Sequence, residues 1–109
     1  MTFYRLYPGS DGQSHFEELD KSASEYLNAT HPATGYLIRT AFAPHIVNFH
    51  CAPRPRWVIT VAGHVDIGVG DGTEIRFHPG DIFLAEDKTG QGHTAKPSQD
   101  WVRAYINLE

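Results

Sequence analysis

The chain of 109 residues is 40% hydrophobic and 20% charged, and its formal net charge at neutral pH is −4. This length suits one domain spanning residues 1–109. No apolar run reaches the roughly eighteen residues that a membrane span needs. The basic residues do not line up along any expected element, so we do not expect nucleic acid as a partner. Because the opening residues lack an apolar signal core, we expect a cytoplasmic protein that does not bind membranes.

The first third of the chain has a less regular pattern than the rest. Residues 2–7 predict an edge strand that ends at the turn Pro8–Gly12. Two later segments, which start at Ser14 and Ser22, have a glutamate three residues on, the spacing of a helix capping box. Neither segment continues as a long apolar run at helical spacing. We therefore expect this region to be irregular or to contain a short helix.

From residue 36 onward, short β-forming runs alternate with turns. The run Trp57–Ala62 is apolar on both faces, which predicts a strand at the centre of its sheet. Gly70-Asp71-Gly72 is a strong hairpin signal, and Pro79-Gly80-Asp81 marks another turn. The expected strands cover residues 2–7, 36–42, 45–51, 57–62, 65–69, 74–77, 82–86 and 101–108. Turns at intervals of about eight to twelve residues are typical of an all-β sandwich or barrel.

The stretch from His50 to Gly63 resembles the first of the two sequence motifs of the cupin superfamily. That motif contains two histidines, a glutamate and a downstream glycine. Aligned on Gly63, the first histidine is His50, while the second histidine is replaced by Ala52 and the glutamate by Arg56. The chain thus resembles a cupin with a degenerate metal motif.

The second cupin motif, a Pro-Gly-Asp turn followed by a strand and a histidine, is similar to residues 79–81 and His93. Residues 11–16, 49–54 and 86–93 resemble, more narrowly, a group of short bacterial single-domain cupins. The resemblance implies an all-β double-stranded β-helix, or jelly-roll barrel, with its core over residues 36–108 and a small-molecule site in its mouth. It also implies a homodimer, because two-sided apolar strands in cupins often pack between protomers.

A catalytic metal in a cupin needs three or four nitrogen and oxygen ligands, and the resemblance leaves only His50 and His93 in ligand positions. Arg56 cannot bind a cation, and at 4 Å it would repel a positive charge by about 4 kcal/mol at an effective dielectric constant of about 20. Either Arg56 turns away from the pocket or the pocket holds no metal of the usual kind. A single divalent ion (Fe, Zn, Ni or Mn) would imply a metal-dependent oxygenase and would need replacement ligands. The candidates for these ligands are His15, His45, Glu86 and Asp87.

Without a metal, the same histidines suggest acid–base catalysis. His50 and His93 would exchange protons, since imidazole titrates near neutral pH, while Arg54 or Arg56 would hold a carboxylate or enolate oxygen through its planar fork. This set predicts a lyase, dehydratase or isomerase that acts on a small polar or carboxylated compound. Two alternatives stay open: a non-catalytic ligand-binding module, and histidines that only satisfy backbone carbonyls.

Aromatic side chains supply candidates for the pocket wall. Phe49, Trp57 and Tyr105 are the candidate substrate-binding rings, although such rings usually belong to the core. Strand alternation places Arg56 and Val58 on one face of their strand and Trp57 on the other, without showing which face meets the pocket.

The polar loop of residues 87–92 leads into His93. Its first residue, Asp87, has two plausible roles: it orients His93 through a hydrogen bond, or it caps the N–H groups of its own loop. Because aspartate commonly caps turns, we expect the capping role.

Overall fold

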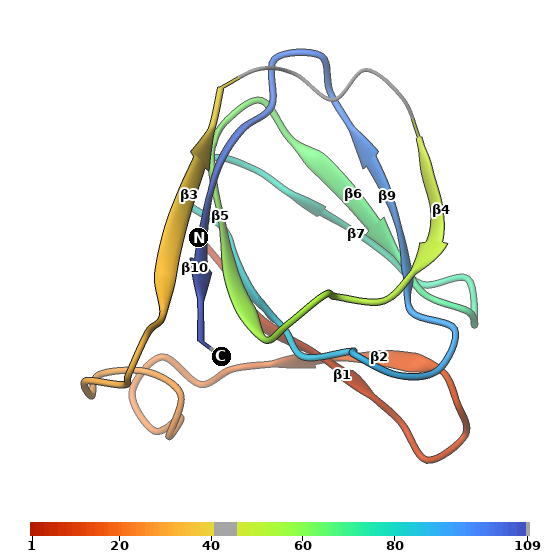
Figure 1. The fold of residues 1–109 in the computed structure, drawn as a ribbon, viewed down its shortest axis with the longest axis horizontal. Coiled ribbons are helices and arrows are strands. Elements are labelled where there is room, and N and C mark those ends of the chain that lie inside the picture. Colours follow the sequence, from red (N-terminus) through yellow and green to blue (C-terminus); the bar gives the residue numbers. More distant parts are fainter. Residues whose placement is uncertain (41–45, 109) are drawn as a thin grey trace.

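The chain folds into two β-sheets that face each other (Figure 1). The computed structural model describes residues 1–40 and 46–108, and within these ranges it contains ten strands and no helix, as the all-β prediction requires. The strands are β1 (Phe3–Pro8), β2 (Ser14–Glu18), β3 (Gly35–Arg39), β4 (Val47–His50), β5 (Arg56–Ala62), β6 (Val65–Gly68), β7 (Glu74–Phe77), β8 (Ile82–Ala85), β9 (His93–Pro97) and β10 (Val102–Asn107). Nor do these residues include a helix with the length and apolar character needed to cross a membrane.

The strand pairing is nested along the chain from β3 to β10. The larger sheet has the order β2-β1-β8-β5-β10-β3, and the smaller has the order β4-β9-β6-β7. Within them β3 pairs with β10, β4 with β9, β5 with β8 and β6 with β7, always antiparallel. The hydrophobic core lies between the sheets and includes Leu6, Val58, Ile67, Phe77 and Phe83. Segments far apart in the sequence are therefore brought side by side around one interior.

The N-terminal segment forms two strands and is irregular over residues 19–34, so of the two alternatives expected for it the short helix is wrong and the irregular segment is found in part. Ser14, expected to cap a helix, begins β2, and its hydroxyl donates a hydrogen bond to Asp87. The second expected cap is a local turn, in which the backbone N–H and the hydroxyl of Ser22 both donate to Asp20. β1 pairs with β2 on one side and with β8 on the other, so residues 2–7 do not form an edge strand. The two-sheet structure therefore begins well before residue 36.

Two predictions from the middle of the chain are confirmed. β5 lies between β8 and β10 in the centre of the larger sheet. The turn after β6 joins it to β7 as an antiparallel hairpin. In that turn the carboxylate of Asp71 accepts a hydrogen bond from the N–H of Thr73 at 2.8 Å, and Gly72 has a φ of 92°, which glycine adopts without steric cost.

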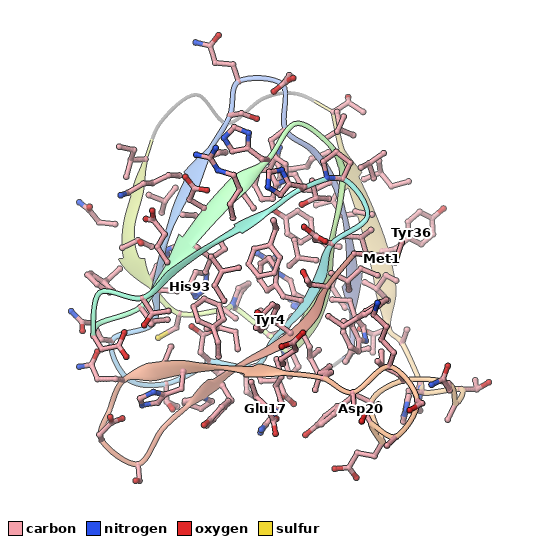
Figure 2. The ribbon with its side chains drawn as sticks, turned by 180° about the vertical axis from the view of Figure 1, so that it is seen from behind. Met1, Tyr4, Glu17, Asp20, Tyr36 and His93 are labelled. Atoms are coloured by element: carbon pink, nitrogen blue, oxygen red, sulfur yellow. The ribbon has the colours of Figure 1, made fainter. Side chains whose placement is uncertain are left out.

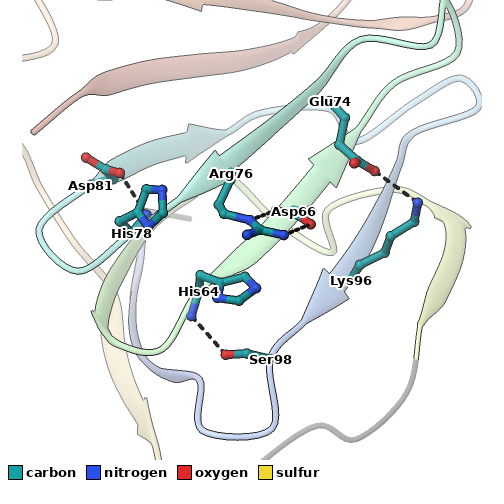
Figure 3. Close-up of polar contacts among 8 residues, drawn as sticks. All are labelled: His64, Asp66, Glu74, Arg76, His78, Asp81, Lys96 and Ser98. Carbon is teal, nitrogen blue, oxygen red and sulfur yellow. Dashed lines mark hydrogen bonds and ion pairs between the residues drawn. The ribbon is translucent and has the colours of Figure 1, made fainter.

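The outer faces of the two sheets differ in polarity. On the smaller sheet, Arg76 donates hydrogen bonds of 2.7 and 2.9 Å to Asp66, and Lys96 forms an ion pair of 3.1 Å with Glu74 (Figure 3). On the larger sheet, Tyr36 is 77% exposed and projects away from the molecule (Figure 2). An outward-facing antiparallel sheet usually carries polar side chains. The larger sheet departs from this rule, because apolar side chains remain uncovered on it.

Candidate active site

A cavity of about 130 Å³ lies between the two sheets. At about 30 Å³ per molecule, it has room for roughly four waters. Strands of both sheets contribute to its wall, and most of the lining is apolar. The side chains that bring polar atoms to it are those of His50, Arg56, His93, Trp101, Arg103 and Tyr105. Chemistry in this space would depend on these six groups.

Two histidines face each other across neighbouring strands of the smaller sheet. His50 ends β4 and His93 begins β9, and the two residues are cross-strand partners. Their ring centroids are 4.4 Å apart and the ring planes are inclined by 56°. His93 is buried between the sheets (Figure 2), whereas His50 is half-buried and its Nδ1 lies 2.7 Å from the carbonyl oxygen of Asn48. Two imidazoles thus meet at one end of the cavity.

Asp87 is hydrogen-bonded to the imidazole of His93. Its Oδ2 atom accepts a hydrogen bond from His93 Nδ1 at 2.6 Å and another from the Ser14 hydroxyl at 2.8 Å, and the residue is fully buried. The expectation that Asp87 caps its loop is therefore wrong; the carboxylate orients the imidazole. A carboxylate that accepts from Nδ1 fixes the proton there and leaves the Nε2 lone pair available. Nε2 of His93 is the nitrogen that can accept a proton from a ligand.

Two arginines approach the same tyrosine from the larger sheet. The Cζ atom of Arg56, on β5, lies 4.1 Å from the centre of the Tyr105 ring. Arg103, on β10, has its Cζ atom 6.0 Å from the same centre and donates a hydrogen bond from Nε to the Tyr105 hydroxyl at 3.2 Å. Arg103 also donates to the carbonyl oxygen of Trp101 and stacks over its ring. Tyr105 is therefore close to two guanidinium groups.

The cavity is electropositive. Burial lowers the pKa of the Arg56 guanidinium; the nearby Tyr105 hydroxyl opposes this change, while Arg39, Arg54 and Arg103 reinforce it. Arginine nevertheless stays protonated at physiological pH. Arg56 forms no ion pair with any residue that the structure describes, and none of the described cavity-lining residues is acidic. A region of positive potential enclosed by apolar walls favours an anionic ligand.

Several candidates from the sequence lie away from this cavity. Arg54 and Phe49 are exposed and do not line it. Trp57 lies on the outer side of the larger sheet, where it lines a groove together with Tyr26 and His31. Strand alternation thus places Arg56 and Val58 on the cavity side, while Trp57 faces the outside.

The sequence interpretation did not single out Arg103. This residue lies on the face of β10 opposite to Val102, Ala104 and Ile106, which share the other face. An arginine that alternates with apolar residues along the strand was the available signal. Its meaning depended on knowing that the face carrying Arg103 and Tyr105 is the inner one.

The residues do not fit a metal site of the usual cupin kind. Among the described residues, no group of three histidine, cysteine, aspartate or glutamate side chains is placed to hold one ion. Asp87 bonds to the Nδ1 side of His93, so it cannot complete a site at Nε2. His15 is hydrogen-bonded to Asp11, and Glu86 is paired with Arg5. His45 lies outside the described residues.

In comparisons with known proteins, no protein-family model matches the chain, and no curated protein matches it with significant similarity. The resemblance to cupins therefore stays a prediction based on a few motif positions.

Proposed function

We propose that the protein binds a small carboxylated compound in the cavity and acts on it by acid–base chemistry of the lyase, dehydratase or isomerase type. The observation that carries this proposal is one enclosed space with two facing imidazoles on one wall and two guanidinium groups on the other. Guanidinium forks bind carboxylates through paired, charge-assisted hydrogen bonds. Imidazole is the side chain best suited to proton transfer at neutral pH.

The geometry suggests a division of labour. Arg56 would hold the ligand's carboxylate, and Nε2 of His93 would remove a proton from the carbon beside it, with Asp87 keeping the opposite nitrogen protonated. The electron pair of the broken C–H bond moves toward the carboxylate, where the positive charge of Arg56 stabilises it. His50 would then donate a proton, either to a leaving group in an elimination or to a neighbouring carbon in an isomerisation. Each step moves a proton or an electron pair and needs no external oxidant.

Deuterium exchange gives a direct test. Small carboxylates incubated with the protein in D₂O should exchange hydrogen at the carbon next to the carboxylate, which proton NMR detects as signal loss. His93→Gln should abolish this exchange. His78→Gln, which changes an exposed histidine outside the cavity, should leave it unchanged. Binding without exchange or product would instead identify a non-catalytic binding module, and no binding of any carboxylate would refute the proposal.

We also propose that the two sheets form the double-stranded β-helix of a cupin. The nested antiparallel pairing of β3 with β10, β4 with β9, β5 with β8 and β6 with β7 supports this topology, because a long hairpin wound into a barrel pairs its strands in this order. Eight such strands in two sheets are the number expected for a jelly roll. A crystal structure with a different strand order would contradict it.

A homodimer is proposed on the basis of the apolar outer face of the larger sheet. β3 is the edge strand of that sheet, and all five of its residues are exposed. Tyr36 and Ile38 are 77% and 58% exposed. Uncovered apolar surface next to an open strand edge favours pairing with a second chain. Light scattering should therefore give the mass of two chains, and Ile38→Lys should reduce it to one; a monomeric wild type would contradict the proposal.

A further inference from the structure

We infer that Ser14 is a positioning residue of the cavity site, because its hydroxyl holds the Asp87 carboxylate in place against the imidazole of His93. The N-terminal hairpin of β1 and β2 therefore belongs to the site, although the expected barrel core begins only at residue 36. This inference rests on the proposed function for the role of His93 as a base. Its structural part, the control that Ser14 exerts over the hydrogen on His93, is independent of any substrate.

Three buried polar side chains from separate parts of the chain form one hydrogen-bonded row. Ser14 begins β2, Asp87 follows β8, and His93 begins β9. The Ser14 hydroxyl donates to Asp87 Oδ2 at 2.8 Å, and the same oxygen accepts from His93 Nδ1 at 2.6 Å. The exposed fractions of the three residues are 1%, 0% and 6%. Solvent therefore has little access with which to replace either bond.

The carboxylate of Asp87 has little other support. Its second oxygen, Oδ1, is buried and accepts no hydrogen bond from the residues that the structure describes. Ser14 thus supplies one of the two hydrogen bonds that these residues make to the carboxylate. A buried carboxylate depends on such donors for its stability and its orientation. Without the hydroxyl, only the contact to His93 would remain, and the carboxylate would be free to turn about it.

The hairpin that carries Ser14 is fixed to the loop of residues 87–92 at a second point. The backbone N–H of Gln91 donates to the carbonyl oxygen of Gly12 at 2.9 Å. Gly90 has a φ of 81°, and a Cβ atom there would lie 2.6 Å from the same carbonyl oxygen, so the two segments touch closely. The position of Ser14 against this loop is thus fixed by the backbone, as a positioning role requires.

The hydrogen bond from Ser14 affects the chemistry through the tautomer of His93. A neutral imidazole carries its hydrogen on one of two nitrogens, and the partner of Nδ1 decides which one. With the carboxylate held at 2.6 Å, the hydrogen stays on Nδ1, and the lone pair of Nε2 is free to take a proton from a ligand. If the carboxylate turns away, part of the population carries the hydrogen on Nε2. That part cannot act as a base toward the ligand.

Proton NMR at neutral pH tests the inference without a substrate. In the wild type, the hydrogen on His93 Nδ1 should give a downfield resonance, because it is bonded to a carboxylate, and it should exchange slowly with water. Ser14→Ala should make this exchange at least about tenfold faster, the factor that the loss of one hydrogen bond to a charged group represents. If Ser14→Ala does not fold, Ser14→Cys keeps a side chain of similar size with a weaker donor, and its exchange should also be faster than in the wild type.

Thr60→Val is the matched control for a loss of stability. Thr60 is 1% exposed, as Ser14 is, and its hydroxyl accepts a hydrogen bond from the Trp101 indole. The variant therefore also loses a buried hydroxyl, but one outside the row that ends at His93. Its effect on the exchange of the His93 hydrogen should stay within about twofold.

Kinetics give a second readout if a carboxylate exchanges hydrogen with D₂O in the wild type. Ser14 is not among the described residues that line the cavity, so it does not contact the ligand. Ser14→Ala should therefore lower kcat for the exchange about tenfold and leave KM within about twofold. A hydroxyl that served only the stability of the fold would leave kcat per folded molecule unchanged.

The outcomes separate this inference from the proposed function. An unchanged His93 signal in Ser14→Ala, an equal change in Thr60→Val, or a wild-type hydrogen on Nε2 would each overturn the inference. If no carboxylate binds or exchanges, the proposed function fails, and the NMR result still decides the role of Ser14. If exchange is found and Ser14→Ala keeps the full kcat, the proposed function stands and the positioning role is refuted.

Discussion

Replacement of Asp87 tests the histidine support most directly. Its carboxylate is fully buried and accepts hydrogen bonds from His93 Nδ1 and from the Ser14 hydroxyl. Asp87→Ala leaves both donors without their acceptor, and each unpaired buried donor costs about 1–3 kcal/mol, so the free energy of unfolding should fall by about 2–6 kcal/mol. Asp87→Asn keeps an acceptor oxygen without the charge, and its loss should be smaller, about 1–2 kcal/mol.

Urea denaturation measures these losses, and nitrogen NMR of the imidazole provides a readout that a purely structural role would not change. Wild-type His93 should be protonated at Nδ1, and Asp87→Ala should shift the proton toward Nε2. Asp11→Ala is a matched control, because Asp11 also bonds to a histidine, His15, but at an exposed position. The reasoning is refuted if Asp87→Ala costs no more than this control, or if wild-type His93 carries its proton at Nε2.

Further predictions concern acid stability and one close backbone contact. The hydrogen bonds from Arg76 lower the pKa of Asp66 in the folded protein. The stability that this carboxylate contributes is therefore present at neutral pH. It is lost as the pH falls from about 4, the pKa of aspartate in the unfolded chain, through the lower pKa of Asp66 in the folded protein. Urea denaturation at pH 7 and pH 3 should therefore show that Asp66→Asn is destabilising mainly at pH 7; an equal difference at both values would contradict the assignment. Gly92 has a φ of 81°, and a Cβ atom there would overlap the carbonyl of His50, so Gly92→Ala should cost about 2–4 kcal/mol and abolish carboxylate binding. Gly12→Ala, at a φ of 79° with no atom within 4 Å of the added Cβ, should cost about 1 kcal/mol and leave binding intact.

Most of the strands after residue 36 could be predicted because their signals are local. The hairpin at Gly70-Asp71-Gly72 and the central position of β5 follow from turn residues and from apolar side chains on both strand faces. β2 was missed because its strand character depends on tertiary contacts. Ser14–Glu18 pairs with β1, and the Ser14 hydroxyl bonds to a carboxylate 73 residues away. No local pattern distinguishes this arrangement from a capping box.

The candidate site could be predicted in part for a similar reason. His50 and His93 occupy recognisable motif positions, and the β4–β9 pairing places them opposite each other. The inward direction of Arg56 and Arg103 could not be predicted, because alternation gives two faces of a strand but does not say which one meets the interior. Asp87 was assigned to its own loop because the distance from its carboxylate to His93 depends on the loop's path.

The topology explains why positive charge collects in this cavity. β5 and β10 are neighbours, and their alternation turns Arg56, Arg103 and Tyr105 toward the same interior. An apolar side chain in place of Arg56 would fill this space at lower energetic cost, since the enclosed guanidinium of Arg56 loses hydration that the Tyr105 ring only partly replaces. An anionic ligand offsets that cost, and at a hundredfold excess over its dissociation constant it would stabilise the fold by about 2.7 kcal/mol. The enclosed charge of Arg56, which forms no ion pair with a described residue, is therefore the feature that most supports the proposal of an anionic ligand.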